Sequence, residues 1–573
     1  MNRYSLRPSL TNDIRASLSV YPDLLAHLLY HRGHTTNEGA DKFINPDYDR
    51  DIHNPFLLKN STRAAERIIK AIREDEKVVI YSDYDTDGIP GGVTLHDFFK
   101  KIGFKNFINY IPHRHDEGFG LNVTAIEQFI KDEVRLIITI DCGIADIVPV
   151  TKATEAGIDV IITDHHLPGE IIPPAYAIIN PKQSDCEYPE KMLCGSGVIF
   201  KLIQAIIQHG NFTDLKEGWE KWLLDMVGIA TLSDMVPLVG ENRVFARYGL
   251  LVLRKTPRLG LVRLLSKLKI QQKYLTEDDI GFMISPRINA ASRMGVPMDA
   301  FNLLVASDEA SADHCVSHLN TINDERKGTV AALIKQVKHT LNERHGKNIP
   351  KVIVLGNPDW RPSLLGLAAN TLAEEYSRPV FLWGRDGDGL LKGSCRSDGV
   401  TNLIALMNAA VPGAFLQFGG HAQSGGFSLG FDEIHTLSDC LNTAYELSAQ
   451  TSAESVEYID SELFLDEVTW KTYSLIDSLA PFGVGNPKPL FIFRNITPRE
   501  VKAFGKEKNH TELVFENSKG KVPAIGFFMK PESLVTEKGE VVEVGKSIDL
   551  VAHIEKSTFR NRPELRLRIV DIL

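Results

Sequence analysis

Short runs of hydrophobic residues alternate with amphipathic stretches between residues 77 and 163. The apolar runs have the length of buried β-strands and lie at 77–82, 107–112, 135–140 and 159–163. The stretches between them have the period of a helix and lie at 92–103, 122–132 and 148–157. Continuously apolar strands that alternate with helices are typical of a parallel sheet covered on both faces. The pattern therefore predicts an α/β domain, which we place at residues 71–300.

The rest of the chain shows other patterns. Residues 1–70 read as a helical segment, and residues 301–345 form a long polar stretch of helical period that we interpret as a connector. Residues 346–455 repeat the strand–helix alternation on a smaller scale and contain the glycine-rich stretch "FGGHAQSGGF". In residues 456–573, short apolar strands are separated by turns, which predicts a small β-barrel, with the oligonucleotide-binding (OB) type as one option. The sequence thus predicts a multidomain α/β chain in five parts.

Bulk composition narrows the class of protein. The chain has 573 residues, too many for one hydrophobic core, with 43% hydrophobic and 24% charged residues. It has no apolar run of membrane-spanning length and no apolar segment at the N-terminus that could be a secretory signal. The six cysteines are scattered without a CxxC pair. These features predict a cytoplasmic protein with reduced thiols and argue against a membrane protein, a structural zinc site or a disulfide frame.

The charge distribution leaves the nature of the partner open. A formal net charge of −10 discourages a nucleic-acid partner at first, but binding depends on local fields rather than on net charge. Residues 243–273 contain several lysines and arginines and no acidic residue. Two interpretations of this basic stretch are equally open: a solvated helix face, or a surface that faces phosphate groups.

Polar side chains gather at the carboxyl ends of the predicted strands, where ligands bind in parallel sheets. "DYDTDG" follows the first strand, "DCG" the third and "TDHH" the fourth, and "SDMVPL" follows a further apolar segment. The residues of this set are Asp83, Asp85, Asp87, Asp141, Asp164, His165, His166 and Asp234. Oxygen ligands with imidazoles and no thiolate suit Mn²⁺ or Mg²⁺, and several carboxylates in a small volume favour two ions that share an aspartate. Because a single Asp-x-Asp is more often a turn or a helix cap, the prediction depends on the conjunction of four clusters.

The four motifs, in this order, resemble those of the DHH phosphoesterase superfamily, and "GGHAQSGGF" is similar to the signature of the accompanying DHHA1 domain. The motifs "PRINAASRM", "KGSCRS" and "LAPFGVGNPKP" narrow the resemblance to a branch of single-strand-specific 5′→3′ DNA exonucleases. The resemblance implies an enzyme that uses two Mn²⁺ or Mg²⁺ ions to hydrolyse single-stranded DNA to mononucleotides, in DNA repair and recombination. It also implies a monomer, with a helicase and a single-strand-binding protein as candidate partners.

The resemblance also implies roles by position. The implied metal ligands are Asp83, Asp85, Asp87, Asp141, His165 and Asp234, with Asp141 as the bridge and Asp83 as a nearby carboxylate. Asp141 and His166 are the implied catalytic residues, and His166 would stabilise the transition state or donate a proton. The implied substrate-binding residues are Arg287, Asn289, Ser394, Arg396, Gly419, Gly420 and His421. In "PHRHDEGFG" we interpret Arg114 as a phosphate contact.

Four features depart from the pattern of the family that the chain resembles. Ser82 stands where relatives often have glycine, and "IPGG" after Gly88 replaces a more hydroxyl-rich run. Ser292 replaces a common glycine, and Arg361 stands where histidine is usual. None of these changes removes an implied metal ligand. Two alternatives stay open: a phosphoesterase for small substrates such as short oligonucleotides or cyclic dinucleotides, and a non-catalytic relative that only binds DNA.

Overall fold

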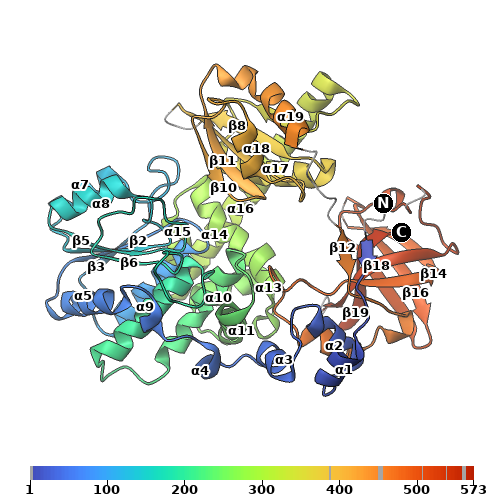
Figure 1. Cartoon of the computed structure of the whole chain (residues 1–573), viewed down its shortest axis with the longest axis horizontal. Coiled ribbons are helices and arrows are strands. Elements are labelled where there is room, and N and C mark those ends of the chain that lie inside the picture. The colour runs from blue at the N-terminus through green and yellow to red at the C-terminus, as the bar shows by residue number, and fades with distance from the viewer. Residues whose placement is uncertain (1–3, 386–388, 449–455, 506, 537–538, 558–562) are drawn as a thin grey trace. The chain divides into compact units, whose positions relative to one another are not determined.

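The computed structural model describes residues 4–385, 389–448, 456–505, 507–536, 539–557 and 563–573. The chain packs into two compact units, which Figure 1 shows. Unit 1 comprises Met1–Ile52, Met235–Arg247 and Ser455–Leu573, and unit 2 comprises His53–Asp234 and Tyr248–Glu454. All the predicted site residues belong to unit 2.

A five-stranded parallel sheet forms the first half of unit 2 and has the order β3-β2-β4-β5-β6. Its strands are β2 (Val78–Ser82), β3 (Phe107–Tyr110), β4 (Leu136–Ile140), β5 (Asp159–Thr163) and β6 (Ala177–Ile179). Its helices are α5 (Ser61–Arg73), α6 (Gly88–Lys101), α7 (Val123–Lys131), α8 (Ile147–Glu155) and α9 (Gly195–Gly210). Figure 1 shows α7 and α8 on one face of the sheet and α5 and α9 on the other. The predicted parallel sheet, buried on both faces, is confirmed.

The order of the strands places a switch point beside β2. From β2 the chain passes to β3 on one side and then returns to β4 on the other side of β2. In open α/β sheets, ligands bind at such a point, beyond the carboxyl ends of the strands. The segments "DYDTDG" and "DCG" follow the two strands that flank it, so the topology itself directs the candidate chemistry there.

Helices connect this sheet to a second sheet in unit 2. They are α10 (Leu224–Ser233), α11 (Gly240–Leu253), α12 (Leu259–Lys267), α13 (Glu277–Asp279), the π-helix η4 (Ile280–Ile284), α14 (Ser285–Met294), α15 (Met298–Val305) and α16 (Glu309–His345). The predicted connector corresponds to α16, which is packed along its length: Val316 and Leu319 join the core of α14 and α15, and Leu333 and Val337 join the core of the second sheet. Among the described residues, no helix combines the length and apolar character needed to span a bilayer.

The second sheet is smaller and mixed, with the order β10-β11-β9-β8-β7. Its strands are β7 (Ile353–Gly356), β8 (Val380–Arg385), β9 (Leu391–Arg396), β10 (Gln417–Gly420) and β11 (Ser424–Leu429), and its helices are α17 (Pro362–Tyr376), α18 (Leu403–Ala409) and α19 (Leu437–Ser448). The glycine-rich stretch forms the hairpin β10–β11, in which Gly419 pairs with Gly426 and Gly420 with Gly425. The hairpin places its turn next to the end of β9.

Unit 1 combines helices from the N-terminal part of the chain with a seven-stranded sheet of order β13-β14-β18-β19-β17-β16-β15. The sheet strands are β13 (Ser461–Glu462), β14 (Phe491–Ile496), β15 (Glu500–Phe504), β16 (His510–Asn517), β17 (Gly520–Gly526), β18 (Ile548–Ser557) and β19 (Glu564–Ile572). The helices are α1 (Asn12–Ser17), α2 (Asp23–Tyr30), α3 (Asn37–Ile44), α4 (Tyr48–Asp51) and α20 (Trp470–Asp477). Leu28 and Phe43 share a core with Phe491 and Leu550 of the sheet, so the predicted segment 1–70 spans both units.

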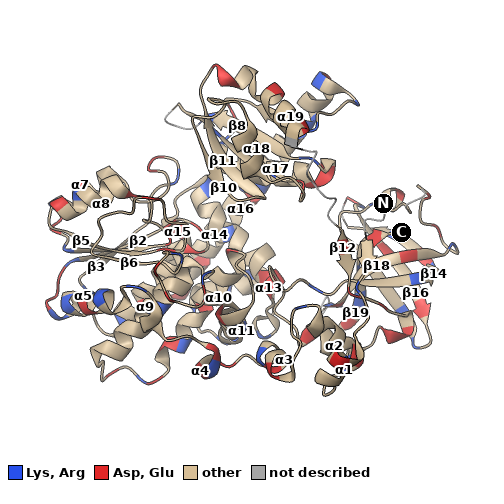
Figure 2. Cartoon of the chain, in the orientation of Figure 1, with Lys and Arg blue, Asp and Glu red and all other residues tan. Residues whose placement is uncertain are grey.

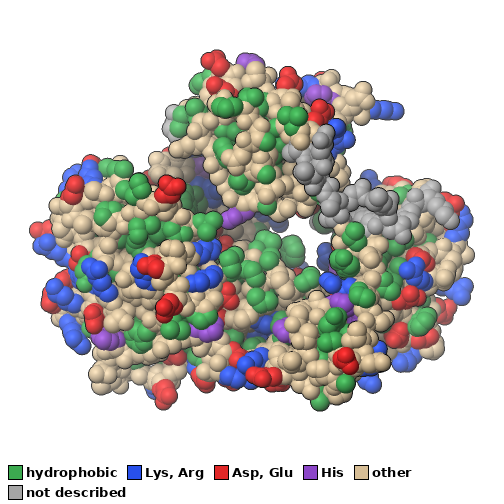
Figure 3. Space-filling model, in the orientation of Figure 1, with side chains coloured by type: hydrophobic (Ala, Val, Ile, Leu, Met, Phe, Trp, Pro, Cys, Tyr) green, Lys and Arg blue, Asp and Glu red, His purple; other side chains and the backbone are tan. Residues whose placement is uncertain are grey.

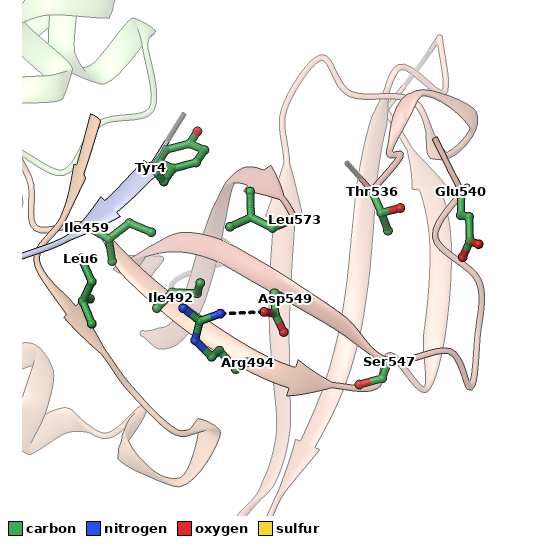
Figure 4. A pocket seen from close by; sticks show the side chains of 10 residues that line it. All are labelled: Tyr4, Leu6, Ile459, Ile492, Arg494, Thr536, Glu540, Ser547, Asp549 and Leu573. Carbon is green, nitrogen blue, oxygen red and sulfur yellow. Dashed lines mark hydrogen bonds and ion pairs between the residues drawn. The ribbon is translucent and has the colours of Figure 1, made fainter. Parts of the chain in front are cut away.

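Strand β1 (Tyr4–Leu6) pairs in parallel with β12 (Glu457–Ile459) at the edge of unit 1. A cavity of about 390 Å³ lies between this pair and the sheet (Figure 4). Its polar lining includes Arg494, whose guanidinium donates to Asp549 at 3.0 Å. The cavity contains none of the predicted site residues.

The basic stretch 243–273 is neither a single solvated helix face nor a single phosphate-facing surface. Arg243 is buried in unit 1, where its guanidinium donates to the carbonyl oxygens of Phe43 at 2.5 Å and Leu479 at 2.9 Å. Arg258 forms ion pairs in unit 2 with Asp97 at 2.5 Å and Asp225 at 2.7 Å. Neither interpretation therefore holds for Arg243 and Arg258, whose side chains stabilise the fold. Figure 3 shows basic and acidic side chains interspersed on the displayed face of the molecule.

Candidate metal centre

The strand register aligns the ends of β2, β4 and β5, so that the polar motifs that follow these strands begin side by side. Ser82 at the end of β2 pairs with Ile140 at the end of β4, and Ile140 pairs with Thr163 at the end of β5. The next residue along β4, Asp141, donates its amide to the Thr163 carbonyl at 2.9 Å and has a φ of 63°. This left-handed backbone conformation is uncommon for residues other than glycine, and aspartate is among the few that adopt it at low cost. It turns the chain sharply at the sheet edge.

The N-terminus of α9 fixes the third carboxylate of "DYDTDG". Asp87 Oδ2 accepts from the Gly195 amide at 2.5 Å, and Asp87 Oδ1 accepts from the Ser196 amide at 2.7 Å. Free amides at a helix N-terminus favour an anion. Gly195 is needed at this join because a Cβ atom there would lie 2.5 Å from Asp141 Cβ. The N-terminus of α9 thus contacts both Asp87 of "DYDTDG" and Asp141 of "DCG".

Seven side chains from four separate segments converge at the end of the sheet. They are Asp83, Asp85, Asp87, Asp141, His165, His166 and Asp234. The Nε2 atom of His165 lies 3.1 Å from Asp141 Oδ1, 3.7 Å from Asp87 Oδ2 and 3.8 Å from Asp234 Oδ2. Figure 2 shows acidic segments at this edge of the parallel sheet, near α14 and α15. The structure therefore brings together every residue that the sequence predicted as a metal ligand.

Burial makes this concentration of carboxylates costly without a cation. Burial, followed by the charges of neighbouring carboxylates, raises the pKa of Asp141 well above its usual range. The same two causes raise the pKa of Asp87 to about 6 and that of Asp234 to about 8. In addition, Asp83 Oδ1 and Asp141 Oδ1 are buried without a hydrogen-bond donor. Carboxylate oxygens with imidazole nitrogen are donors that suit Mn²⁺ or Mg²⁺, so the residues present fit such ions.

The two adjacent histidines have opposite protonation states. Burial, followed by the charge of His166, lowers the pKa of His165 to about 3, so its imidazole is neutral and can be a ligand. Burial would also lower the pKa of His166, but the hydrogen bond and the charge of Asp164 outweigh it and raise that pKa to about 9. His166 is therefore protonated at neutral pH.

Asp164 is a positioning residue that the sequence placed in the cluster without a role. Its Oδ1 accepts from the amides of His165 and His166 and from His166 Nδ1 at 2.8 Å. Its Oδ2 accepts from the Ile144 amide at 3.0 Å. Both oxygens thus accept from donors of the protein, whereas Asp83 Oδ1 and Asp141 Oδ1 have no donor.

Two predicted substrate residues, Asn289 and Arg114, lie beside the centre, and a third, Arg287, lies on the same helix as Asn289. Asn289 of α14 accepts from the Thr86 amide at 3.0 Å and so contacts the "DYDTDG" loop. The guanidinium of Arg114 lies 4.7 Å from the centroid of the Tyr84 ring. Arg287 is buried and donates to Asn320 Oδ1 at 2.7 Å, so much of its hydrogen-bonding capacity serves the fold.

The other predicted substrate residues share one corner of the second sheet. They are Ser394, Arg396, Gly419, Gly420 and His421, which lie on β9, on β10 or directly after β10. Arg396 and Ser394 pair with Ser424 and Gly426 of β11. The Gly366 position of α17 approaches them closely, because a Cβ atom there would lie 2.8 Å from Arg396 Nη2.

The structure gathers an arginine cluster that the sequence predicted only in part. It consists of Arg114, Arg287, Arg293, Arg326 and Arg396. Burial, followed by the charges of Arg114 and Arg326, lowers the pKa of Arg293 to about 9, and Asp85 of the metal centre acts on it in the opposite sense. Figure 3 shows basic and histidine side chains in the hollow between the two sheets of unit 2. Guanidinium groups gathered in one place are suited to bind an anion.

Arg293 and Arg326 were missed by sequence reasoning. Arg293 Nη1 donates to the Ser363 carbonyl at the start of α17, at 2.6 Å, and so joins α14 to the second sheet's helix. Arg326 lies in the middle of α16, where its guanidinium donates to Asn323 Oδ1 at 3.0 Å. A signal for Arg293 existed, since it belongs to the motif "PRINAASRM", whereas Arg326 carries no signal in a polar helix.

Family models match three parts of the chain. The DHH family N-terminal domain matches residues 77–231, the DHHA1 domain matches residues 350–445, and the RecJ OB domain matches residues 459–571.

Two relatives that match nearly the whole chain share a name. The chain is 34% identical to the single-stranded-DNA-specific exonuclease RecJ of Bacillus subtilis (strain 168) over 557 residues, which cover 96% of this chain and 67% of the relative. It is 30% identical to the protein of the same name from Dickeya dadantii (strain 3937) over 581 residues, which cover 98% of this chain and 97% of the relative.

Solved structures show the same fold. The crystal structure of RecJ in complex with Mn²⁺ from Thermus thermophilus matches with a TM-score of 0.78 and 24% identity, over 100% of this chain and 79% of that one. A crystal structure of exonuclease RecJ bound to manganese matches with a TM-score of 0.58 and 28% identity, over 69% of this chain and 98% of that one.

Proposed function

Because this chain belongs to the RecJ family of single-stranded-DNA-specific exonucleases, we propose that it degrades single-stranded DNA from the 5′ end to mononucleotides. It is a metal-dependent exonuclease with Mn²⁺ or Mg²⁺ as cofactor. The observation that carries the proposal is the convergence of carboxylates and imidazoles from four segments at the switch point of a parallel sheet. We propose that it acts in DNA repair and recombination.

Three overlapping groups of residues make up the candidate metal centre. Asp83, Asp85 and Asp141 form one group, and Asp87, His165 and Asp234 form a second. The third group, Asp141, His165 and His166, shares one residue with each of the other two. Asp141 Oδ1 lies 3.1 Å from His165 Nε2, so Asp141 is the residue best placed to bridge two ions. When bound, the ions would lower the pKa of a water molecule and neutralise charge on the scissile phosphate.

His166 supplies a positive charge beside these ligands, since its Nδ1 atom lies 3.9 Å from Asp141 Oδ1. Its Nδ1 atom is held by Asp164 at 2.8 Å, and its pKa of about 9 keeps it protonated at neutral pH. A protonated imidazole here stabilises the charge that develops on the phosphate oxygens and can give a proton to the leaving oxygen. Asp164 holds the ring in this orientation.

The arginine cluster is the proposed site for the phosphates of the strand. Arg114, Arg293 and Arg396 come from three different elements, and guanidinium groups bind phosphate oxygens in pairs. Ser394 and His421 add donors, and Gly419 and Gly420 carry no side chains at the end of β10, so that a nucleotide can approach the backbone there. The OB domain offers a further surface for the strand, since its fold is used by proteins that bind single strands.

A helicase that supplies single strands and a single-strand-binding protein are the proposed protein partners. A monomeric state and a cytoplasmic location stay predictions, as do the five domain boundaries. The match to the RecJ OB domain disfavours the small-substrate alternative, because a dinucleotide needs no such domain.

Product analysis on single strands labelled at the 5′ or the 3′ end tests the proposal. With Mn²⁺ or Mg²⁺ we expect labelled mononucleotide to appear first from the 5′-labelled strand, and no product with a chelator. Asp141→Asn is expected to lose hydrolysis and keep DNA binding, whereas the exposed Asp185, which pairs with Lys59, gives a matched control as Asp185→Asn. Equal release from both ends would refute the polarity. Faster hydrolysis of a dinucleotide than of a long strand would favour the small-substrate alternative, and full activity in Asp141→Asn would refute the metal centre.

A further inference from the structure

The metal ligand Asp234 depends on the backbone around it for its position. Asp87 is held by two amides at the N-terminus of α9, and Asp85 Oδ1 accepts from the Asp87 amide at 2.7 Å. In the part of the chain that the structure describes, no hydrogen bond reaches the Asp234 carboxylate, whose Oδ2 atom lies 3.8 Å from His165 Nε2. Its orientation therefore follows from the end of α10 on one side and from the segment 235–239 on the other.

The segment that follows Asp234 is short and has little freedom. Met235 has a φ of 58°, in the left-handed region that few residues other than glycine adopt. Pro237 fixes its own φ and restricts Val236 to extended conformations. Because only these three residues separate Asp234 from Leu238, a displacement of Leu238 is passed on to the ligand.

A loop of unit 1, residues 479–487, holds this segment at Leu238. The loop and the segment Met235–Arg247 both belong to unit 1. The buried Leu238 donates its amide to the Val484 carbonyl at 2.7 Å. A Cβ atom at Gly483 would lie 2.8 Å from Leu238 Cδ1, so the glycine leaves the room that the leucine needs.

The loop 479–487 is itself held firmly. Asn486 is fully buried, and its Nδ2 atom donates to the carbonyl oxygens of Leu479 and Pro481 at 2.8 and 2.9 Å. Its Oδ1 atom accepts from Arg32 Nε at 2.8 Å. Gly483 and Asn486 also exchange two backbone hydrogen bonds of 2.9 and 3.1 Å. These contacts make the loop a fixed support.

The support and the ligand are joined through the chain itself. The predicted metal ligands belong to unit 2, but the segment directly after Asp234 belongs to unit 1. We propose that the loop 479–487 is a positioning element for Asp234 and sets the affinity of the ion that this carboxylate helps to bind. The inference rests on the metal centre of the proposed function. It gives the motif "LAPFGVGNPKP", which contains the loop, a role in metal binding.

Displacing Asp234 should weaken one ion and not the other. Replacing a residue that orients a metal ligand typically lowers metal affinity about 10- to 100-fold. Gly483→Val crowds Leu238 and is therefore expected to weaken the binding of one Mn²⁺ ion about 10- to 100-fold and to leave the other unchanged. Gly483→Val/Leu238→Ala keeps the total side-chain volume, so the affinity should recover. In the background of Asp234→Asn, which removes the ligand, Gly483→Val should have no further effect.

Titration calorimetry of Mn²⁺ into the DNA-free protein measures these affinities. Wild type is expected to bind two ions. Gly526→Val is the matched control, because a Cβ atom at Gly526 would lie 3.1 Å from Met529 Sδ in the same unit. This change crowds unit 1 without contacting Leu238, so it should lower the melting temperature and leave both affinities unchanged.

The outcomes separate the inference from the proposed function. Unchanged Mn²⁺ affinities in folded Gly483→Val, or an equal loss in the Asp234→Asn background, would overturn the positioning role and leave Asp234 to α10 alone. A wild type that binds no Mn²⁺ would overturn the metal centre and this inference with it. A wild type that binds two Mn²⁺ ions but releases no nucleotide would refute the proposed function and not the positioning role.

A second variant covers the case in which Gly483→Val does not fold, as circular dichroism would show. Leu238→Ala removes the packed side chain without adding atoms, and it is expected to cause the same selective loss of one ion. Two unchanged affinities in Leu238→Ala would overturn the positioning role.

Discussion

The hydroxyl oxygen of Ser82 occupies the space that a side chain at Gly92 would need. A Cβ atom at Gly92 would lie 2.3 Å from Ser82 Oγ, at the place where α6 crosses the end of β2. The serine of β2 and the glycine of α6 are therefore a matched pair beneath the metal centre.

We expect Gly92→Ala to destabilise the protein, although alanine is normally the better helix former. The added methyl group meets Ser82 in a packed core, and overpacking of this kind costs about 1–3 kcal/mol of the free energy of unfolding. Gly328→Ala in α16 is the matched control, because no atom lies within 4 Å of its Cβ position. That change should stabilise the helix by about 1 kcal/mol. Thermal melting monitored by circular dichroism measures both.

The double variant Ser82→Gly/Gly92→Ala separates the clash from other causes. Removing the hydroxyl makes room for the methyl group, so we expect the double variant to be more stable than the sum of the single changes predicts, by about 1 kcal/mol or more. Strict additivity of the two changes would contradict the proposed contact.

The stability of the metal-free protein should fall as the pH rises from about 6.5 to about 9. In the folded state the pKa of Asp234 is about 8 and that of His166 about 9, whereas the ordinary values are 3.8 and 6.5. In this range the folded protein holds protons that the unfolded chain has released, so the contribution of both groups is lost with rising pH. Asp87, whose pKa in the folded protein is about 6, also loses its contribution as the pH rises, but at lower pH.

Melting temperatures with and without Mn²⁺ measure this dependence. His165, whose pKa is lowered to about 3, acts in the opposite sense, but only between pH 3 and 6.5, below the range in question. Saturating Mn²⁺ replaces the protons on the carboxylates, so the metal-bound protein should melt at nearly the same temperature across the range. A melting temperature of the chelated protein that rises with pH would contradict the electrostatic description of the centre.

The metal centre can be predicted from the sequence because the topology of the parallel sheet brings its residues together. Asp83, Asp141 and His165 follow strands whose carboxyl ends meet at one edge, so their proximity follows from a local pattern. No comparable rule brings Arg326 in the middle of α16 to Arg293 in α14, because that contact depends on how two helices pack. Arginine usually lies on the surface of a protein, yet Arg243 is buried and donates to carbonyl groups of distant segments.

Asp164→Asn should shift the pH dependence of hydrolysis rather than only reduce the rate. The hydrogen bond and the charge of Asp164 raise the pKa of His166 to about 9, so its loss should return that pKa toward 6.5. If the protonated imidazole is the active form, the alkaline limb of the rate profile should move to lower pH by at least one unit, and most activity at pH 8 should be lost. Single-turnover rates at saturating DNA between pH 5.5 and about 9.5 measure the shift.

Asp146→Asn is the control for this change. Asp146 is also a partly buried carboxylate that accepts from a backbone amide, but it holds Leu121 and not His166. Its replacement should lower the rate at all pH values without moving the alkaline limb. An unshifted limb in Asp164→Asn would show that His166 acts without titrating in this range.

Arg293→Gln should weaken the binding of single-stranded DNA and lower its dependence on salt. The guanidinium belongs to the arginine cluster beside Asp85, and removal of one phosphate contact should reduce the slope of log K against log salt by about 0.7 for a single strand. We expect an affinity loss of about tenfold, and Arg293→Lys should restore the slope while recovering only part of the affinity, since lysine cannot form paired hydrogen bonds. Arg263→Gln, at an arginine that pairs with Glu309 and Asp313, is the control and should leave the slope unchanged. Because Arg293 also donates to the Ser363 carbonyl, the melting temperature must be measured beside the affinity: a lower melting temperature with an unchanged salt slope would assign Arg293 to the joint between α14 and α17 and not to the DNA.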